Sequence, residues 1–259
     1  MNKIATIGAV ESAVLSRLNH AWKQRRQENA DPAPLPILIA ITGGSGSGKS
    51  WLADRLQQAF GKESARLSLD DFYRDLSSMT LQEREKVNFD HPRSIDWPCV
   101  EHVLSDCRAS RLTRLPRYDF KTHTRIPKSE WFQPKLLIFM DGLWLLNGPA
   151  MRASFDLKIF IDCSAVLRLE RRVARDVAER GRSPLSVRQQ FEIEVAPMHD
   201  RHVAPKAHWA DIFLKQPLED KDIHQLADQI WGLLSLMVSK QAWMRSALQT
   251  ELCTFLRTH

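Results

Sequence analysis

One short stretch limits the possible folds of this chain more than any other. The segment Gly43-Gly-Ser-Gly-Ser-Gly-Lys-Ser50 holds four of the ten glycines and directly follows an apolar run at residues 37–41. Such a run is typical of a strand buried on both faces of a parallel sheet, and a helical pattern begins near Lys49. Glycines let a backbone curl around phosphate with its N–H groups turned inward, and the next helix adds the positive end of its dipole. The pattern G-x-x-x-x-G-K-[ST] therefore predicts a phosphate-binding loop rather than a flexible glycine turn.

The positions of this pattern have separate expected tasks. We expect Lys49 to reach the β- and γ-phosphates of a nucleotide, and the Ser50 hydroxyl to bind Mg²⁺. The backbone expected to cradle the phosphates is formed by Gly43, Gly44, Ser45, Gly46, Ser47 and Gly48.

Further apolar runs repeat along the chain and predict its architecture. They lie at residues 65–69, 136–140 and 157–161, with a weaker one at 210–214, and helical patterns separate them. This alternation predicts a three-layer α/β fold of the P-loop NTPase type, with a mainly parallel sheet covered by helices. An amphipathic helix is expected within residues 1–30, a proline-rich linker at 31–36 and a helical segment at 221–259.

Composition and charge restrict the class of protein. The net charge of +6 favours anionic partners, which could be a nucleic acid, a membrane surface or the phosphates of a nucleotide. The cysteines are scattered and form no CxxC pair, which argues against a disulfide framework or a structural zinc site and indicates a reducing cytosol. No stretch has the shape of a signal peptide, and the apolar run 230–238 is too short to span a bilayer. The sequence thus predicts a soluble cytoplasmic protein.

Two of the apolar runs end in acidic residues. Asp70 and Asp71 end one run, and Asp141 ends another. Ligands of open α/β sheets bind outside the carboxyl ends of the strands. An acid there can hold Mg²⁺, and a second acid can accept the proton of an attacking hydroxyl. A helix cap or a solvated loop acid is the plainer alternative for each, and the sequence does not assign the two tasks.

Seven arginines fall between Arg168 and Arg188. A helical period places Arg168, Arg172 and Arg175 on one face and an apolar stripe of Leu169, Val173 and Val177 on another. A solvated basic face is the ordinary interpretation of such a run. Here the segment Arg180-Gly181-Arg182 follows, and a flexible joint between two guanidinium groups suits a lid that closes on a triphosphate. A nucleic-acid patch is less favoured, because no nucleic-acid-binding motif accompanies the arginines.

Several longer blocks resemble the uridine–cytidine kinases, which are related to phosphoribulokinase and the bacterial pantothenate kinases. The resemblance covers about residues 36–217 and, besides the glycine-rich loop, rests on these blocks: Ser68-Leu-Asp-Asp-Phe-Tyr73, Asn88-Phe-Asp-His-Pro92, Pro116-Arg-Tyr-Asp-Phe-Lys-Thr-His-Thr-Arg125, Phe155-Asp-Leu-Lys-Ile-Phe-Ile-Asp162, the arginine stretch, and Pro197-Met-His199 leading to Ala210-Asp211. It implies a kinase domain at 37–220, with a nucleoside-binding segment near 88–125 and an arginine-rich lid near 168–190. It also implies transfer of the γ-phosphate of ATP or GTP to the 5′-hydroxyl of uridine or cytidine, in pyrimidine salvage.

The resemblance also implies roles for individual residues. Asp70 matches the acid that activates the nucleoside hydroxyl and helps to hold Mg²⁺ with Ser50 and Asp141. Asp90 matches the acid that binds the ribose hydroxyls. The remaining matches are Tyr118 and His123 at the pyrimidine edge, Phe89 and Phe120 around the base, Arg172 and Gln190 in the nucleoside pocket, and Arg175, Arg180 and Arg182 near the phosphates.

Three positions depart from the family pattern. Asp141 stands where the family usually has glutamate, so we expect its contact with Mg²⁺ to run through a water molecule. Asp71 replaces a small residue and gives an Asp-Asp-Phe-Tyr string similar to that of glycerate kinases. Trp51 is bulky for its position, and the sequence offers no functional account of it.

Other functions stay open from the sequence alone. A kinase of the same fold could act on glycerate, pantothenate, a sugar phosphate or a nucleoside monophosphate, and a catalytically weak nucleotide-binding regulator or a nucleic-acid-binding module is a further alternative. A phosphorylated acceptor needs additional cations in its pocket, whereas the acceptor blocks offer Asp90, Tyr118 and His123. The expected partner is therefore a small nucleoside, with no nucleic acid and no membrane. The apolar helix around Trp231 and Leu234 could equally complete the core or form the interface of a homo-oligomer.

Overall fold

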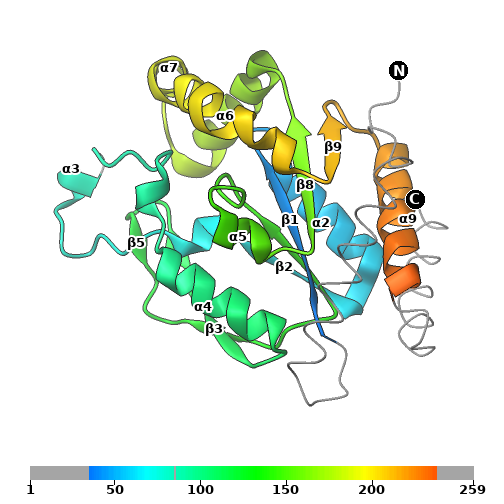
Figure 1. The fold of residues 1–259 in the computed structure, drawn as a ribbon. Coiled ribbons are helices and arrows are strands. Elements are labelled where there is room, and N and C mark those ends of the chain that lie inside the picture. The colour runs from blue at the N-terminus through cyan, green and yellow to red at the C-terminus, as the bar shows by residue number, and fades with distance from the viewer. Residues whose placement is uncertain (1–34, 85, 238–259) are drawn as a thin grey trace.

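The computed structural model describes residues 35–84 and 86–237. The expected N-terminal helix, most of the linker and the chain after residue 237 lie outside these ranges. Five parallel strands form the central sheet, in the order β2-β7-β1-β8-β9 (Figure 1). Their bounds are β1 Ile37–Gly43, β2 Ser64–Ser68, β7 Leu137–Asp141, β8 Leu157–Asp162 and β9 Ile212–Lys215. Each falls within one or two residues of a predicted apolar run, which confirms the parallel α/β architecture.

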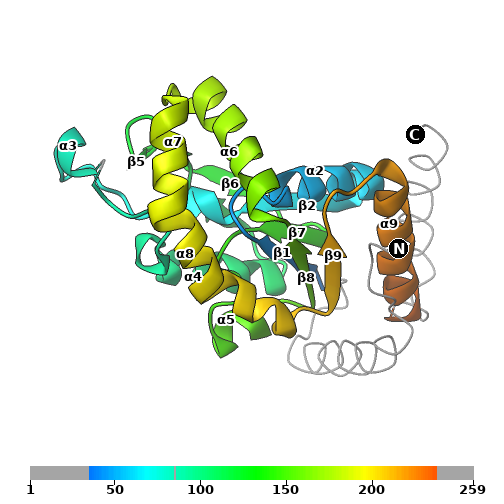
Figure 2. The same ribbon diagram turned by 90° about the horizontal axis from the view of Figure 1, so that it is seen from above.

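Helices cover both faces of the sheet. On one face, α2 (Lys49–Phe60) and α9 (Asp220–Met237) pack against alternate residues of β1, β7 and β8. On the other face lie α4 (Trp97–Arg108) and α5 (Pro149–Ala153). Figure 2 shows the two layers on opposite sides of the strands. Every residue of β1 is buried, as expected for a central parallel strand.

A third group of helices lies over the carboxyl end of the sheet. Helix α6 (Ala165–Arg180) follows β8 and ends at Gly181, which has a left-handed conformation with φ of 65°. After the non-helical residues 181–183, the chain is helical from Pro184 to Trp209, with two π-helical segments (Figure 2). The segments are α7 (Pro184–Gln190), η5 (Phe191–Val195), α8 (Ala196–Met198), η6 (His199–Val203) and η7 (Ala204–Trp209).

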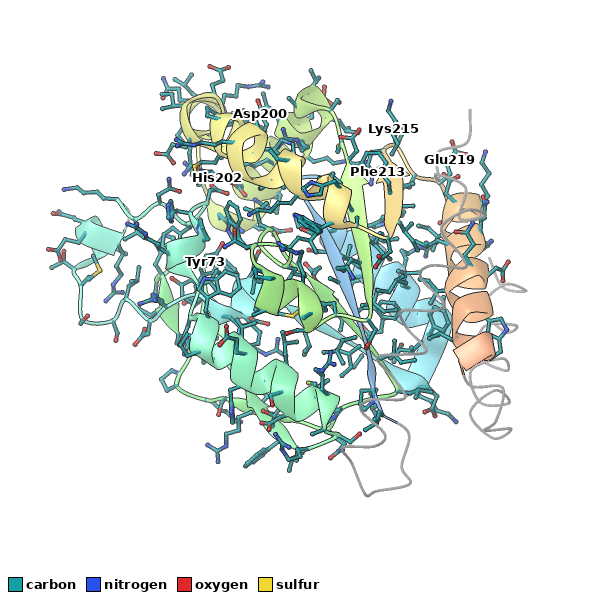
Figure 3. The ribbon with its side chains drawn as sticks, viewed as in Figure 1. Tyr73, Asp200, His202, Phe213, Lys215 and Glu219 are labelled. Atoms are coloured by element: carbon teal, nitrogen blue, oxygen red, sulfur yellow. The ribbon has the colours of Figure 1, made fainter. Side chains whose placement is uncertain are left out.

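The chain between β2 and β7 forms the other wall of the same end. Its described residues contain no strand of the main sheet, but fold into two small antiparallel ribbons, β3 with β6 and β4 with β5. Its short elements are η3 (Leu69–Phe72), α3 (Leu81–Arg84), η4 (Pro92–Ser94), β3 (Thr113–Leu115), β4 (Tyr118–Asp119), β5 (Thr124–Arg125) and β6 (Glu130–Phe132), while the single turn η2 (Gly61–Glu63) precedes β2. Figure 3 shows Tyr73 on this side, whereas Phe213 and Lys215 lie along the opposite edge strand β9.

The orientation of α6 differs from the ordinary interpretation of its sequence. Arg168, Arg172 and Asp176 are buried, while Val166 and Val177 are exposed. The arginine face is therefore not a solvated basic surface, because it points at the end of the sheet where the glycine-rich loop lies. Among the described residues, no helix is both long enough and apolar enough to cross a membrane.

Candidate active site

The glycine-rich loop has the backbone of a phosphate-binding loop. Gly46 and Gly48 have φ of +80° and +91°, a region that favours glycine, and α2 begins at Lys49 as predicted. The Lys49 ammonium donates to the Gly44 carbonyl at 2.9 Å. Burial lowers the pKa of Lys49, whereas Asp70 and Asp141 raise it. A β-carbon on Gly46 would lie 2.4 Å from the carbonyl oxygen of Arg168, so the loop packs directly against the backbone of α6.

The acid at the end of β7 is held from two sides. The Ser50 hydroxyl donates to Asp141 Oδ2 at 2.8 Å, and Arg66 Nε donates to Asp141 Oδ1 at 2.8 Å. Arg66 also donates to Asp54 at 2.7 Å. Asp141 has 3% exposure, and β2 and β7 bring it opposite Ser68 in the sheet. The predicted partners Ser50 and Asp141 are thus in direct contact.

The two adjacent acids after β2 have different surroundings. Asp70 lines a cavity with Lys49, and its pKa is raised by burial and by the nearby Asp141, against the opposite effect of Lys49. Asp71 points elsewhere: its carboxylate accepts from Arg117 at 3.0 Å. Of the two acids, Asp70 therefore faces the cavity, whereas Asp71 is held by Arg117 and does not line it.

A cavity of about 630 Å³ joins the two walls at the carboxyl end of the sheet. On one wall it contacts the glycine-rich loop and the first turn of α2, and on the other the segment around residues 87–123. Predicted site residues that line it are Ser45, Gly46, Gly48, Lys49, Ser50, Asp70, Phe89, Asp90, Phe120, His123, Asp141, Arg172, Arg175, Arg180, Arg182 and Gln190. Gly43, Gly44 and Ser47 lie in the loop but do not line this cavity.

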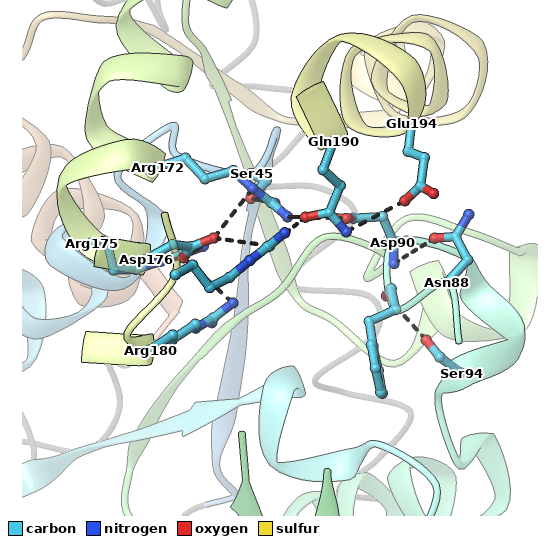
Figure 4. A network of polar contacts seen from close by, with 12 residues as sticks. Ser45, Asn88, Asp90, Ser94, Arg172, Arg175, Asp176, Arg180, Gln190 and Glu194 are labelled. Atoms are coloured by element: carbon cyan, nitrogen blue, oxygen red, sulfur yellow. Dashed lines mark hydrogen bonds and ion pairs between the residues drawn. The ribbon is translucent and has the colours of Figure 1, made fainter. Parts of the chain in front are cut away.

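Arg172, Arg175 and Arg180 of the cavity gather around the carboxylate of Asp176 (Figure 4). Arg172 donates to the Ser45 hydroxyl at 2.8 Å and to the Gln190 side chain at 3.1 Å, and it pairs with Asp90 at 3.4 Å. It thereby connects the glycine-rich loop with the segment around residues 87–123, called the acceptor wall below after the role expected of it. Arg182 also donates to Gln190.

The acceptor wall is an aromatic cluster. Phe89 and His123 stack with ring centroids 4.6 Å apart, and Tyr118 lies 5.4 Å from Phe120. His123 has φ of 55°, a rare conformation for a residue other than glycine. Tyr118 does not line the cavity directly, because it lies behind the lining with 6% exposure. No described residue forms a hydrogen bond with its hydroxyl.

Some residues of the cavity were not assigned a role from the sequence. Tyr73 lines it and donates to the Phe89 carbonyl at 3.3 Å, although the sequence offered it only as part of a motif. Trp51, Lys121 and Arg171 also line it. Trp51 follows Ser50 in the first turn of α2 and has an exposure of 41%.

The comparison with known protein families settles the relationship. The model of the phosphoribulokinase / uridine kinase family matches residues 38–224. This chain belongs to that family. The match covers the sheet, the glycine-rich loop, the acceptor wall and α6, so every part of the cavity lies within it.

Named relatives of the family agree with this. A uridine kinase of Ligilactobacillus salivarius is 37% identical over 187 residues, covering 72% of this chain and 88% of that protein. A uridine kinase of Chloroflexus aurantiacus is 39% identical over 178 residues, covering 68% and 85%. Among solved structures, a putative fructose transport system kinase from Silicibacter has a TM-score of 0.57 at 21% identity, covering 78% of this chain and 98% of that one. At that identity the structure supports the fold alone.

The residues present fit a nucleotide and a magnesium ion. Lys49 follows a loop in which Gly46 and Gly48 have left-handed φ, the kind of backbone that binds phosphate. Magnesium keeps several waters and is usually held by one or two carboxylates together with substrate phosphates. Ser50 and Asp141 supply that kind of partial site. The described residues contain no cluster of three or more potential ligands.

Proposed function

We propose that this protein transfers the γ-phosphate of ATP, or GTP, to the 5′-hydroxyl of uridine or cytidine. One observation carries the proposal: a single cavity is lined by the glycine-rich loop, by Asp70 and Asp90, and by the aromatic acceptor wall. The donor phosphates and a hydroxyl-bearing planar acceptor would therefore meet at Asp70. The curated relatives are named uridine kinases, which supports this choice of acceptor.

In this proposal the reaction depends on positioning and electrostatics. Asp70 accepts the proton of the 5′-hydroxyl, for which its burial and raised pKa suit it. Lys49, Arg175 and Arg180 stabilise the charge that develops on the transferred phosphoryl group. Asp90 accepts from the ribose hydroxyls, and Arg172 holds Asp90 in place.

The metal would be held by Ser50 and Asp141, with Asp70 nearby. When bound, Mg²⁺ would supply positive charge that offsets the charge of the nucleotide phosphates. Because Arg66 already donates to one oxygen of Asp141, the other oxygen and the Ser50 hydroxyl would be the groups available to the metal or its waters.

The wider setting follows from the same proposal. We infer a kinase domain at 37–220, with the acceptor segment at 88–125, the arginine-rich lid at 168–190 and a C-terminal helical segment at 221–259. Its place would be pyrimidine salvage in the cytoplasm, without nucleic acid or membrane as partner. Assembly into a homo-oligomer stays a prediction.

The test is the release of ADP with MgATP against a panel of acceptors: uridine, cytidine, D-glycerate, pantothenate, UMP and none. We expect turnover with uridine or cytidine, and a loss of about 10²- to 10⁴-fold in Asp70→Asn. The matched control is Asp71→Asn, which removes the charge of the adjacent acid that pairs with Arg117 and should retain most activity. Turnover with glycerate alone, or full activity of Asp70→Asn, would contradict the assignment.

A further inference from the structure

A buried acid that no step above uses lies at the centre of the arginines. Asp176, on α6, has a side-chain exposure of 0%. Four guanidinium groups surround its carboxylate (Figure 4). Arg175 lies at 2.8 Å and Arg180 at 3.5 Å from Oδ1, and Arg172 at 3.5 Å and Arg182 at 3.8 Å from Oδ2.

The same residue also shapes the end of the helix. The backbone N–H groups of Gly181 and Arg182 both donate to the Asp176 carbonyl, which fixes the left-handed turn after Arg180. The side chain and the main chain of Asp176 therefore act on the same arginines, one through charge and the other through the path of the backbone.

The two carboxylate oxygens are used differently. Arg175 Nε donates a hydrogen bond to Oδ1 at 2.8 Å. The ion pairs of Oδ2 are longer, and no described residue forms a hydrogen bond with it. Arg172 and Arg182 are thus held near Asp176 without being fully occupied by it. Their remaining donors reach Ser45, Asp90 and Gln190.

The charge balance shows what this acid does. Four guanidinium groups at one end of a cavity repel each other strongly, since the Coulomb energy rises as the effective dielectric falls. One acid among four cations lowers this repulsion but leaves a clear positive excess for an anionic ligand. Repulsion from Arg175, added to burial, lowers the pKa of Arg180, while Asp176 raises it.

We propose that Asp176 is a positioning residue for phosphoryl transfer, which gathers Arg172, Arg175, Arg180 and Arg182 into one geometry around the transferred phosphate. It does not touch the substrates itself. This inference takes the identity of the acceptor from the proposed function. The role of the arginines toward a triphosphate does not depend on which acceptor is used.

The proposal makes an unusual prediction for Asp176→Asn. Removing the acid raises the positive charge of the cavity, so a non-hydrolysable ATP analogue should bind as tightly as before or about 3- to 10-fold more tightly. Turnover should nevertheless fall about 10- to 100-fold, because the arginines are no longer held in the productive arrangement. A purely structural role would weaken binding and turnover together.

The experiment measures three quantities for each full-length variant: the Kd of the analogue and of ADP, the kcat with MgATP and uridine or cytidine, and the melting temperature. The matched control is Glu179→Gln, which removes the same charge from an exposed position of α6 and should resemble the wild type. Asp176→Glu restores the charge and should return the Kd of the analogue to the wild-type value while recovering part of the turnover.

The outcomes separate the possibilities. Lower turnover with equal or tighter binding of the analogue supports the proposal. A parallel loss of binding, turnover and melting temperature overturns it, as do wild-type values in every assay. If Asp176→Asn does not fold, Asp176→Glu decides: reduced turnover with unchanged binding supports the role, and any other result overturns it. If the wild type uses neither nucleoside, the proposed function fails, and the hydrolysis of ATP without acceptor replaces kcat in the comparison.

Discussion

The only two tyrosines of this chain lie in the same aromatic cluster and give a matched pair of variants. The Tyr73 hydroxyl donates to the Phe89 carbonyl at 3.3 Å, whereas no described residue forms a hydrogen bond with the buried Tyr118 hydroxyl. A buried hydroxyl without a partner costs about 1–3 kcal/mol, and an ordinary hydrogen bond contributes about 1 kcal/mol. The change from tyrosine to phenylalanine should therefore have opposite effects at the two positions.

We expect Tyr118→Phe to raise the free energy of unfolding by about 1 kcal/mol, which is about 2–4 °C in melting temperature for a domain of this size. Tyr73→Phe should lower it by a similar amount. If the Tyr118 hydroxyl also donates to the pyrimidine, its loss should raise the KM for uridine or cytidine about 3- to 10-fold and leave kcat nearly unchanged.

The assays are thermal unfolding without ligand and initial rates over a range of nucleoside concentrations. Equal losses of melting temperature in the two variants would refute the argument from the buried hydroxyl. An unchanged KM in Tyr118→Phe would refute the contact with the base, even if the stability rises as expected.

Three further predictions concern the surroundings of the site. Burial and Arg168 lower the pKa of His199 to about 4, so the unfolded chain binds a proton at a higher pH than the folded chain does. The free energy of unfolding should therefore fall by about 1 kcal/mol between pH 7 and pH 5, after allowance for the partial exposure of His199. Denaturant unfolding of His199→Gln at several pH values should lack this part of the pH dependence. Lys158→Met should remove the ammonium that pairs with the buried Asp211 at 3.1 Å, although the backbone N–H of residue 158 still donates to that carboxylate, and lower the melting temperature by about 6–12 °C; a change below 2 °C would contradict this. Gly46→Ala should abolish nucleotide binding in a calorimetric titration. Gly181 also has a positive φ, but the space around it is open, so Gly181→Ala should only lower the free energy of unfolding by about 1 kcal/mol.

Local patterns predicted the sheet and the glycine-rich loop well. The apolar runs of β1, β7 and β8 are buried on both faces, so they leave a continuous signal, and the loop is a single uninterrupted motif. The separate tasks of Asp70 and Asp71 were not predictable, because adjacent residues carry no information on which side chain faces the cavity. The cavity lining, which includes Asp70, and the contact of Asp71 with Arg117 show that difference.

The arginine helix shows another limit of the sequence. The helical period grouped Arg168 with Arg172, but a period alone does not show whether a polar face meets solvent or the interior of the protein. Asp176 was overlooked among the arginines. The signal existed, since Asp176 is four residues from both Arg172 and Arg180, the spacing of ion pairs along a helix.

The tight packing of Gly46 against Arg168 also determines how α6 can move. Because α6 packs against the loop at Arg168, the helix can rotate about that contact, but it cannot move along its axis without disturbing the loop. At a rise of 1.5 Å per residue, Arg172 lies about 6 Å and Arg180 about 18 Å from this pivot. A tilt of about 10° would then shift Arg172 by about 1 Å and Arg180 by about 3 Å. The contacts of Arg172 with Ser45 and Asp90 would therefore change about three times less than the position of Arg180 at the far end of the helix.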